Sequence, residues 1–193
     1  MTVWHWVRHG PTHAKEFVGW RDLAADLSDR DQINRLRGHL PDEALLMSSD
    51  LSRAAETANV LQKPSYRRLP DDPHLRELHF GLWDGLHFEK VSARDPRLSR
   101  QYWETPGDVQ APGGESWNEA SERVHATVTR INHRYPDAHV VVVAHFGVIL
   151  TQLQRAMGVP AYEVLANKID NLSVTQLTWV RGKGCAELIN HLP

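Results

Sequence analysis

Hydrophobic positions along the chain follow two alternating patterns, short unbroken apolar runs and segments with helical spacing. The apolar runs predict strands at 3–7, 44–48, 139–144, 174–180 and 186–189. Helical spacing appears over 28–40, 51–62, 116–135 and from Gly147 to about Met157. Ser28 and Asp50 are the expected N-caps of the first two helices. Strands that alternate with helices predict an α/β fold, a three-layer α/β/α sandwich with a largely parallel central sheet.

Residues 82–114 interrupt this alternation. They combine Trp83 and Trp103 with charged residues and with helix and strand breakers, namely Pro96, Pro106, Pro112, Gly113 and Gly114. We therefore expect a small irregular or short-helical insertion over the active site, within a single domain that covers residues 1–193.

Composition and charge narrow the class of protein. The formal net charge of -2 shows no basic excess, so we expect no nucleic-acid partner. The run 140–144 is too short to cross a bilayer, and the first residues lack the long apolar stretch of a signal peptide. Cys185 is the only cysteine, which excludes an internal disulfide and fits a reducing compartment. We expect a cytoplasmic protein without a membrane partner; the sequence leaves its oligomeric state open.

Two histidines follow predicted strands directly. His9 comes after the first strand, and His145 comes after the strand 139–144. Ligands of open α/β sheets bind beyond the carboxyl ends of the strands, so the two imidazoles are expected in one pocket.

The tripeptide Arg8-His9-Gly10 places an imidazole beside a fixed cation on a tight loop. Neutral imidazole is a nucleophile near neutral pH, and unlike an anion it is not repelled by a negatively charged phosphoryl group. A neighbouring guanidinium can hold two phosphoryl oxygens at once. Taken alone, the tripeptide is better explained by a strand-end histidine that caps a turn.

Three further segments carry candidate residues. Arg53 lies on the first turn of the second predicted helix, and His145 follows a buried strand. Glu77 is surrounded in sequence by large apolar residues, which raise the pKa of a carboxyl group and suit it to general acid catalysis. The ordinary alternatives are a surface arginine, a loop histidine and a glutamate that faces water.

Together the segments 8–12, 48–58, 75–85 and 142–147, with the closing 171–175, resemble the histidine phosphatase superfamily, which includes the cofactor-dependent phosphoglycerate mutases. The resemblance implies that His9 accepts the phosphoryl group. Arg8, Arg53 and His145, together with Thr12, would bind the phosphoryl oxygens. Glu77 would protonate the leaving group and later deprotonate water. No cofactor and no metal are implied, because two arginines supply the charge that Mg²⁺ supplies in kinases.

The resemblance has one departure. Family members often carry an asparagine three residues after Thr12, where this chain has Lys15. The amine of Lys15 could reach a second anionic group of a substrate or could lie in solvent.

Two local motifs resemble the phosphatase branch of the family more than the mutases. They are Phe80-Gly81 followed by Trp83-Asp84-Gly85, and Pro112-Gly113-Gly114-Glu115-Ser116. The second motif has an ordinary alternative, since such a turn could serve only to start the long helix. The expected activity is a metal-independent phosphomonoesterase acting on a small phosphorylated metabolite, with α-ribazole 5′-phosphate as first candidate.

Three alternatives stay open. A phosphoglycerate mutase-type isomerase would return the phosphoryl group to a bound phosphoglycerate. A phosphohistidine-protein phosphatase is disfavoured by the insertion at 82–114, which such proteins tend to lack. A non-catalytic binding module is disfavoured because all five core residues are present.

Overall fold

The computed structural model describes residues 1–193 and is built on one six-stranded sheet. The strands are β1 (Thr2–Arg8), β2 (Leu45–Ser48), β3 (Arg67–Arg68), β4 (His139–Ala144), β5 (Val174–Val180) and β6 (Lys183–His191). Their order is β3-β2-β4-β1-β5-β6. The first four are parallel, β5 is antiparallel to β1, and β6 is antiparallel to β5. The prediction of a largely parallel sheet is confirmed.

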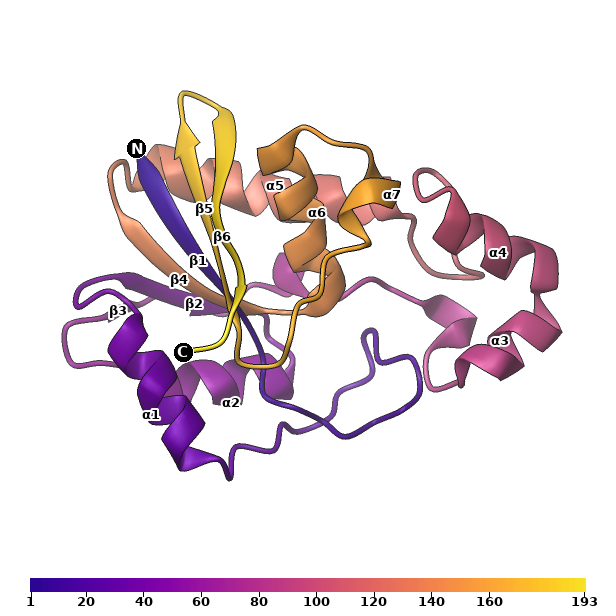
Figure 1. Ribbon diagram of the computed structural model, residues 1–193, viewed down its shortest axis with the longest axis horizontal. Helices are drawn as coiled ribbons and strands as arrows, with labels where there is room; N and C mark the ends of the chain where they lie inside the picture. Colours follow the sequence, from indigo (N-terminus) through magenta and orange to yellow (C-terminus); the bar gives the residue numbers. More distant parts are fainter.

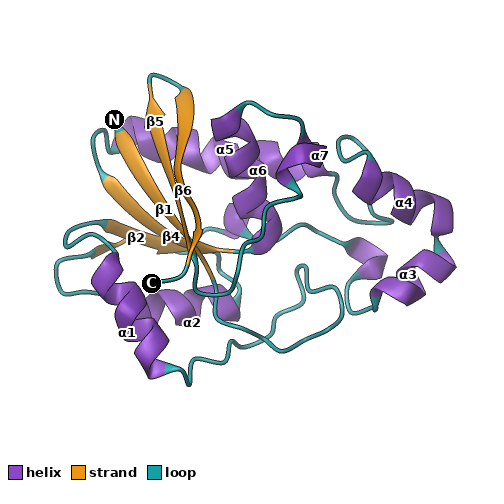
Figure 2. Cartoon of the chain, viewed as in Figure 1, coloured by secondary structure: helices purple, strands orange, loops and turns teal.

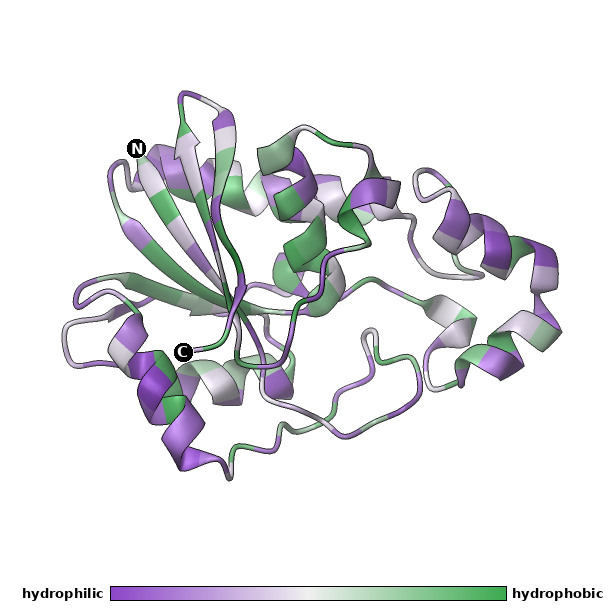
Figure 3. Cartoon of the chain, viewed as in Figure 1, coloured by the Kyte–Doolittle hydropathy of each residue, from purple (hydrophilic) through white to green (hydrophobic).

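Helices cover both faces of the sheet, which confirms the three-layer sandwich (Figure 1). One face packs against α1 (Arg30–His39) and α2 (Ser52–Leu61), and the other against α5 (Trp117–Arg134) and α6 (Phe146–Met157). The short helix α7 (Ala161–Val164) follows α6. Because β4 contributes alternate valines to both apolar layers, its sequence is an unbroken apolar run. Figure 3 shows β2, β4 and α6 as mostly hydrophobic.

Two short helices, α3 (Phe88–Arg94) and α4 (Pro96–Glu104), occupy the segment 82–114. They lie beyond the carboxyl ends of the parallel strands, next to the long loop that follows β1 (Figures 1 and 2). Phe17 of that loop stacks on Trp103 of α4 with ring centroids 5.8 Å apart. The insertion therefore packs against the loop that leaves His9. No helix of the chain combines the length and the apolar composition that a bilayer crossing requires.

Both predicted helix caps are wrong. Asp29, not Ser28, caps α1 by accepting the Gln32 N–H at 2.9 Å. Asp50 makes an ion pair with Arg76 at 2.6 Å and does not cap α2. Instead, the carboxylate of Asp22 accepts the N–H and the hydroxyl of Ser52 at 2.8 and 2.6 Å. The cap of α2 thus comes from a loop thirty residues earlier, which local sequence patterns cannot reveal.

A buried histidine lies in the middle of β1. His5 is 7% exposed, and its Nε2 lies 3.1 Å from Nδ1 of His139 on β4. Burial, together with the nearby His139 and His39, lowers the pKa of His5 to about 4. In the unfolded chain the pKa of His5 is about 6.5, so the unfolded state binds a proton more readily than the folded state.

We predict a stability loss on acidification that depends on His5. The stabilisation is fully present above pH 6.5 and is lost as the pH falls toward 4, because protonation then favours the unfolded chain. The slope from one such histidine is at most about 1.4 kcal/mol per pH unit. Denaturant melts of His5→Gln should have a flatter pH dependence than the wild type. His133→Gln, at an exposed position of α5, should keep the full dependence. An unchanged slope in His5→Gln would contradict the prediction.

Candidate active site

His9 and His145 lie side by side at the carboxyl ends of β1 and β4. The backbone N–H of His9 donates to the Ala144 carbonyl at 3.1 Å, and the two imidazole ring centroids are 5.0 Å apart. Both residues are buried, at 6% and 0% exposure. The parallel pairing of β1 with β4 is what brings together residues 136 positions apart in the chain, with Arg8 in register with Ala144.

The hydrogen bonding of His9 determines which ring nitrogen carries the proton in the neutral form. Nδ1 lies 2.6 Å from the Gly10 carbonyl oxygen, which can only accept, so the Nδ1 proton is the donor. Nε2 is then left with its lone pair. Burial lowers the pKa of His9 to about 3, and the charges of Arg53 and Arg8 act in the same direction. At physiological pH this imidazole is therefore neutral, the form in which it is a nucleophile.

Arg53 orients the second histidine. From the first turn of α2 its Nε donates to Nδ1 of His145 at 3.2 Å, while Nη1 and Nη2 donate to the carbonyls of Arg21 and Gly19 at 2.9 and 2.7 Å. Because Nδ1 of His145 accepts, its proton resides on Nε2. That Nε2 is buried and has no partner in the protein. Burial lowers the pKa of His145 well below its usual value, with the charges of its neighbours adding to the effect.

Arg8 adds a second, half-buried cation. Its Nη1 donates to the Ile169 carbonyl at 2.7 Å, and its buried Nε has no partner. Neither Arg8 nor Arg53 forms an ion pair with a carboxylate, and burial lowers the pKa of both. A buried donor without a partner is costly, and so is a buried charge without a counterion. The cluster of Arg8, His9, Arg53 and His145 is therefore suited to bind an anion with several acceptor oxygens.

Glu77 lies at the N-terminus of α6, beside this cluster. Its carboxylate accepts the Gly147 N–H at 3.0 and 3.1 Å and the Leu78 N–H at 2.9 Å. The residue is 7% exposed, and burial raises its pKa. The two backbone N–H groups and the charges of Arg53 and Arg8 oppose that shift without reversing it. A carboxyl group with a raised pKa can hold a proton and release it during a reaction.

Three other residues considered from the sequence lie outside the cluster's direct contacts. Thr12 is half-buried in the loop after Gly10, and Lys15 in the same loop is exposed. The carboxylate of Asp84 accepts the N–H groups of Gly19 and Arg21 at 3.1 and 2.9 Å. Asp84 therefore fixes the loop whose carbonyls receive Arg53.

Two supporting residues were not predicted. The hydroxyl of Thr57 accepts the Gly10 N–H at 3.0 Å and donates to the Arg53 carbonyl at 2.7 Å, so it joins two parts of the cluster. Asn171 donates from Nδ2 to the His9 carbonyl at 2.8 Å. Asn171 belongs to the closing segment of the family resemblance, which was the available signal. Thr57 lies one helical turn after Arg53, and only the folded chain brings it to Gly10.

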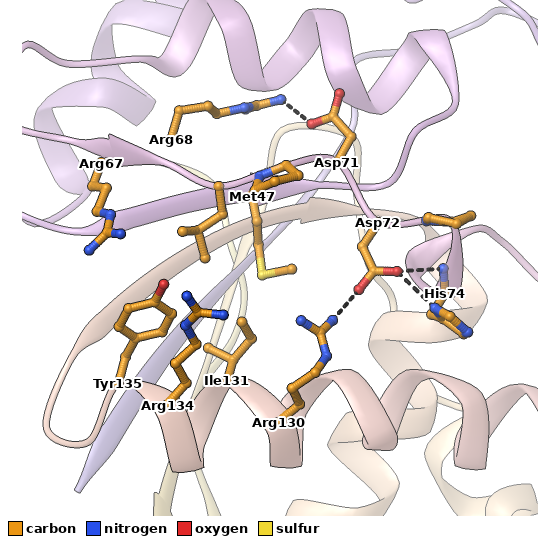
Figure 4. Close-up of a pocket in the computed structure, with 13 residues that line it drawn as sticks. Met47, Arg67, Arg68, Asp71, Asp72, His74, Arg130, Ile131, Arg134 and Tyr135 are labelled. Carbon is orange, nitrogen blue, oxygen red and sulfur yellow. Dashed lines mark hydrogen bonds and ion pairs between the residues drawn. The ribbon is translucent and has the colours of Figure 1, made fainter.

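A separate groove of about 520 Å³ lies between the β3 edge and α5 (Figure 4). Its lining includes Arg67, Arg134 and Tyr135 but none of the four residues of the cluster. The groove is therefore distinct from the candidate active site.

The fold and the cluster together define a phosphoryl-transfer type of site on an α/β sandwich. Comparison with known families agrees, because the model of the histidine phosphatase superfamily (branch 1) matches residues 5–191. The chain therefore belongs to the histidine phosphatase superfamily and is an enzyme of that class.

The chain is similar to several proteins of this superfamily. It is 32% identical over 158 residues to phosphoglycerate mutase-like protein 4 of Arabidopsis thaliana, covering 78% of this chain and 69% of that one. It is 30% identical to a bifunctional protein of Mycobacterium tuberculosis over 95% of its own length, and spans about half (52%) of that relative.

Solved structures extend the similarity over nearly the whole chain. A mycobacterial glucosyl-3-phosphoglycerate phosphatase in complex with VO3 superposes with a TM-score of 0.85 at 28% identity, covering 97% of this chain and 98% of the other. The α-ribazole phosphatase of Shigella flexneri has a TM-score of 0.81 at 22% identity, covering 98% and 96%. At 22% identity, the similarity to the α-ribazole phosphatase shows a shared fold only.

We predict that Gly147→Ala destabilises the protein by about 1–3 kcal/mol, the usual cost of overpacking. A Cβ at this position would lie 2.6 Å from Oε1 of Glu77 and 2.8 Å from Leu78 Cδ1, inside the packed interior. Gly38→Ala is the matched control, because a Cβ there would meet no atom within 4 Å. That variant, in α1, should be as stable as the wild type or more so. Equal stability of the two variants in denaturant melts would contradict the prediction.

Proposed function

We propose that the protein is a metal-independent phosphomonoesterase that forms a phosphohistidine on His9. The observation that carries the proposal is the pair of buried donors without partners, Nε2 of His145 and Nε of Arg8, next to a neutral His9. Such donors match the equatorial oxygens of a phosphoryl group, and the free lone pair of His9 matches its phosphorus.

In the first half-reaction, Nε2 of His9 attacks the phosphorus in line with the ester oxygen. The N–P bond forms, the P–O bond breaks, and its electron pair goes to the leaving oxygen. Glu77 donates its proton to that oxygen, so the product leaves as an alcohol. Arg8, Arg53 and His145 hold the phosphoryl oxygens, and the hydroxyl of Thr12 would add a further contact.

In the second half-reaction, water attacks the phosphohistidine. The Glu77 carboxylate takes a proton from the water, the N–P bond breaks, and inorganic phosphate is released with His9 neutral again. The raised pKa of Glu77 supports both roles, because the group must gain and lose a proton in every cycle.

Metal independence follows from the charges already in the site. Arg8 and Arg53 supply two positive charges without carboxylate partners, which is the charge that Mg²⁺ supplies in kinases. The donors around the phosphoryl position are N–H groups, whereas Mg²⁺ requires oxygen ligands.

The proposed substrate is a small phosphorylated metabolite. Two of the similar structures are phosphatases named for their substrates, glucosyl-3-phosphoglycerate and α-ribazole phosphate. The first of these phosphatases is the more similar to this chain in sequence. Both are phosphate monoesters of hydroxylated compounds, so both belong in a first screen. We also propose a cytoplasmic location, which fits a chain whose single cysteine excludes an internal disulfide.

A phosphoglycerate mutase-type reaction is the second candidate, favoured by the similarity to phosphoglycerate mutase-like protein 4 of Arabidopsis thaliana. It shares the first half-reaction and differs only in the acceptor, which would be a bound phosphoglycerate instead of water. A phosphohistidine-protein phosphatase would need room for a polypeptide, and the packing of α4 on the loop after His9 is unfavourable for it.

The test is a screen of phosphorylated metabolites, with phosphate release as readout, for wild type and His9→Asn in the presence and absence of EDTA. Asparagine can keep the donor to the Gly10 carbonyl, so the fold should be retained. It has no counterpart of Nε2, so the nucleophile is removed. We expect wild-type turnover to survive EDTA and the variant to lose it completely. Isomerised phosphoglycerate without free phosphate would favour the mutase. Loss of activity that Mg²⁺ or Zn²⁺ restores, or an active His9→Asn, would contradict the proposal.

A further inference from the structure

Side-chain donors from two other parts of the chain bind the main chain that carries Glu77. Arg123 of α5 donates from Nη1 to the carbonyls of His74 and Arg76 at 2.6 and 3.0 Å, and from Nη2 to the Glu77 carbonyl at 3.3 Å. Trp20 donates from its indole Nε1 to the same Glu77 carbonyl at 2.8 Å. One guanidinium therefore binds three carbonyls of a segment that has no regular secondary structure of its own beyond a short 3₁₀ turn at 73–75.

Glu115 completes the clamp from the other side of Glu77. Its Oε1 accepts from Arg123 Nη2 at 2.5 Å and from the His79 N–H at 2.9 Å, while its Oε2 accepts from Arg123 Nε at 3.1 Å. The two side chains are 15% and 14% exposed, so the pair is largely shielded from solvent. The backbone is thus fixed at 74–77 by Arg123 and at 79 by Glu115.

The Gly113-Gly114 turn explains how Glu115 reaches this position. A Cβ on Gly114 would lie 2.0 Å from the His79 carbonyl oxygen, an impossible contact. The glycine allows the Glu115 N–H to donate to that same carbonyl at 2.9 Å. The turn also starts α5, since Ser116 forms a capping box with Glu119. The motif therefore serves both the helix start and the segment of Glu77.

The face of α5 that carries Arg123 also binds Asp72, at the beginning of the segment that leads to Glu77. The carboxylate of Asp72 accepts from Thr127 at 2.9 Å and from Arg130 at 2.6 Å, and Figure 4 shows it between Arg130 and His74. Arg123, Thr127 and Arg130 are spaced by four and three residues, so they lie on one stripe of the helix. This stripe binds the chain from Asp72 to Glu77 along two helical turns.

We propose that Arg123 is a positioning residue for Glu77, acting together with Glu115 and Trp20. The inference rests on the proposed function, because that function gives Glu77 the acid and base roles. The carboxyl group is at the end of a flexible side chain, and a displacement of about 1 Å in a catalytic group can cost about 10²-fold in rate. Fixing the main chain at both sides of Glu77 restricts where the carboxyl group can go.

The experiment compares an alkyl phosphate with p-nitrophenyl phosphate, using single-turnover phosphorylation of His9 and steady-state kcat and KM. An alkyl leaving group needs a proton in the first step, whereas p-nitrophenolate needs it much less. Glu77→Gln is the reference and should slow phosphorylation by the alkyl phosphate by about 10²–10⁴-fold, with a much smaller effect on p-nitrophenyl phosphate. A purely structural defect would slow both substrates by the same factor.

We expect Arg123→Gln, like Glu77→Gln, to slow the alkyl phosphate more than p-nitrophenyl phosphate. Phosphorylation of His9 by the alkyl phosphate should slow by about 10–100-fold, with a nearly unchanged KM. Arg123→Lys should recover part of the loss, because an ammonium group can still donate to two of the carbonyls. Arg155→Gln is the matched control. Arg155 also contacts α5, through Ser121 at 2.8 Å and Glu122, is 27% exposed, and makes no hydrogen bond to residues 72–79. It should leave both substrates unaffected.

The two levels of the proposal fail differently. If Glu77→Gln discriminates between the substrates but Arg123→Gln slows both equally or neither, the positioning role is wrong and the proposed function stands. If the wild type has no turnover, or Glu77→Gln does not discriminate, the proposed function fails and this inference with it. If Arg123→Gln does not fold, Trp20→Phe replaces it, since phenylalanine keeps an aromatic ring and removes one donor to the Glu77 carbonyl. If Trp20→Phe then slowed both substrates by the same factor, or slowed neither, the inference would be overturned.

Discussion

The site depends on withdrawing two guanidinium groups from water, Arg53 fully and Arg8 in part, without placing a carboxylate against either of them. Arg53 is 1% exposed, and its Nη atoms donate to the carbonyls of Gly19 and Arg21. Arg8 uses the Ile169 carbonyl in the same way. Neutral carbonyls satisfy N–H groups but leave the net charge in place, and that uncompensated charge makes the pocket attractive for an anion. A carboxylate in their place would have neutralised the pocket.

This constraint determines how the neighbouring chain is arranged. The loop after His9 must return to α2 so that its carbonyls face Arg53, and two acidic residues hold it there. Asp84 accepts the backbone N–H groups of Gly19 and Arg21, and Asp22 accepts the first N–H of α2. The acidic groups of this region thus bind the backbone of the loop and leave the guanidinium of Arg53 unpaired.

The same burial sets the protonation of the reacting groups in opposite directions. Removal from water lowers the pKa of His9 and His145 and raises the pKa of Glu77, because each group then prefers its uncharged form. An uncharged imidazole has a free lone pair, and an uncharged carboxyl group has a proton to give. One physical cause therefore prepares the two groups that the proposed first half-reaction requires.

The sequence predicts those features of the fold and site that depend on local pattern. The run 139–144 agrees with β4 to the residue because both faces of that strand are buried. The two-residue β3 has no such pattern and was missed, as was the cap that Asp22 provides to α2. His9 and His145 could be placed in one pocket because parallel strands end at one edge of the sheet. The contacts of Arg123 and Glu115 with the Glu77 segment could not be predicted, because that segment lies about forty residues earlier in the chain.

The central claim is that the phosphoryl group passes through His9 before it reaches water. The most direct measurement is the stereochemical course at phosphorus, followed with a substrate whose phosphoryl group is made chiral by one sulfur atom and by oxygen isotopes. Two successive in-line displacements each invert the configuration, so the account predicts overall retention. Overall inversion would mean that water attacks the substrate directly, and it would contradict a phosphohistidine on His9.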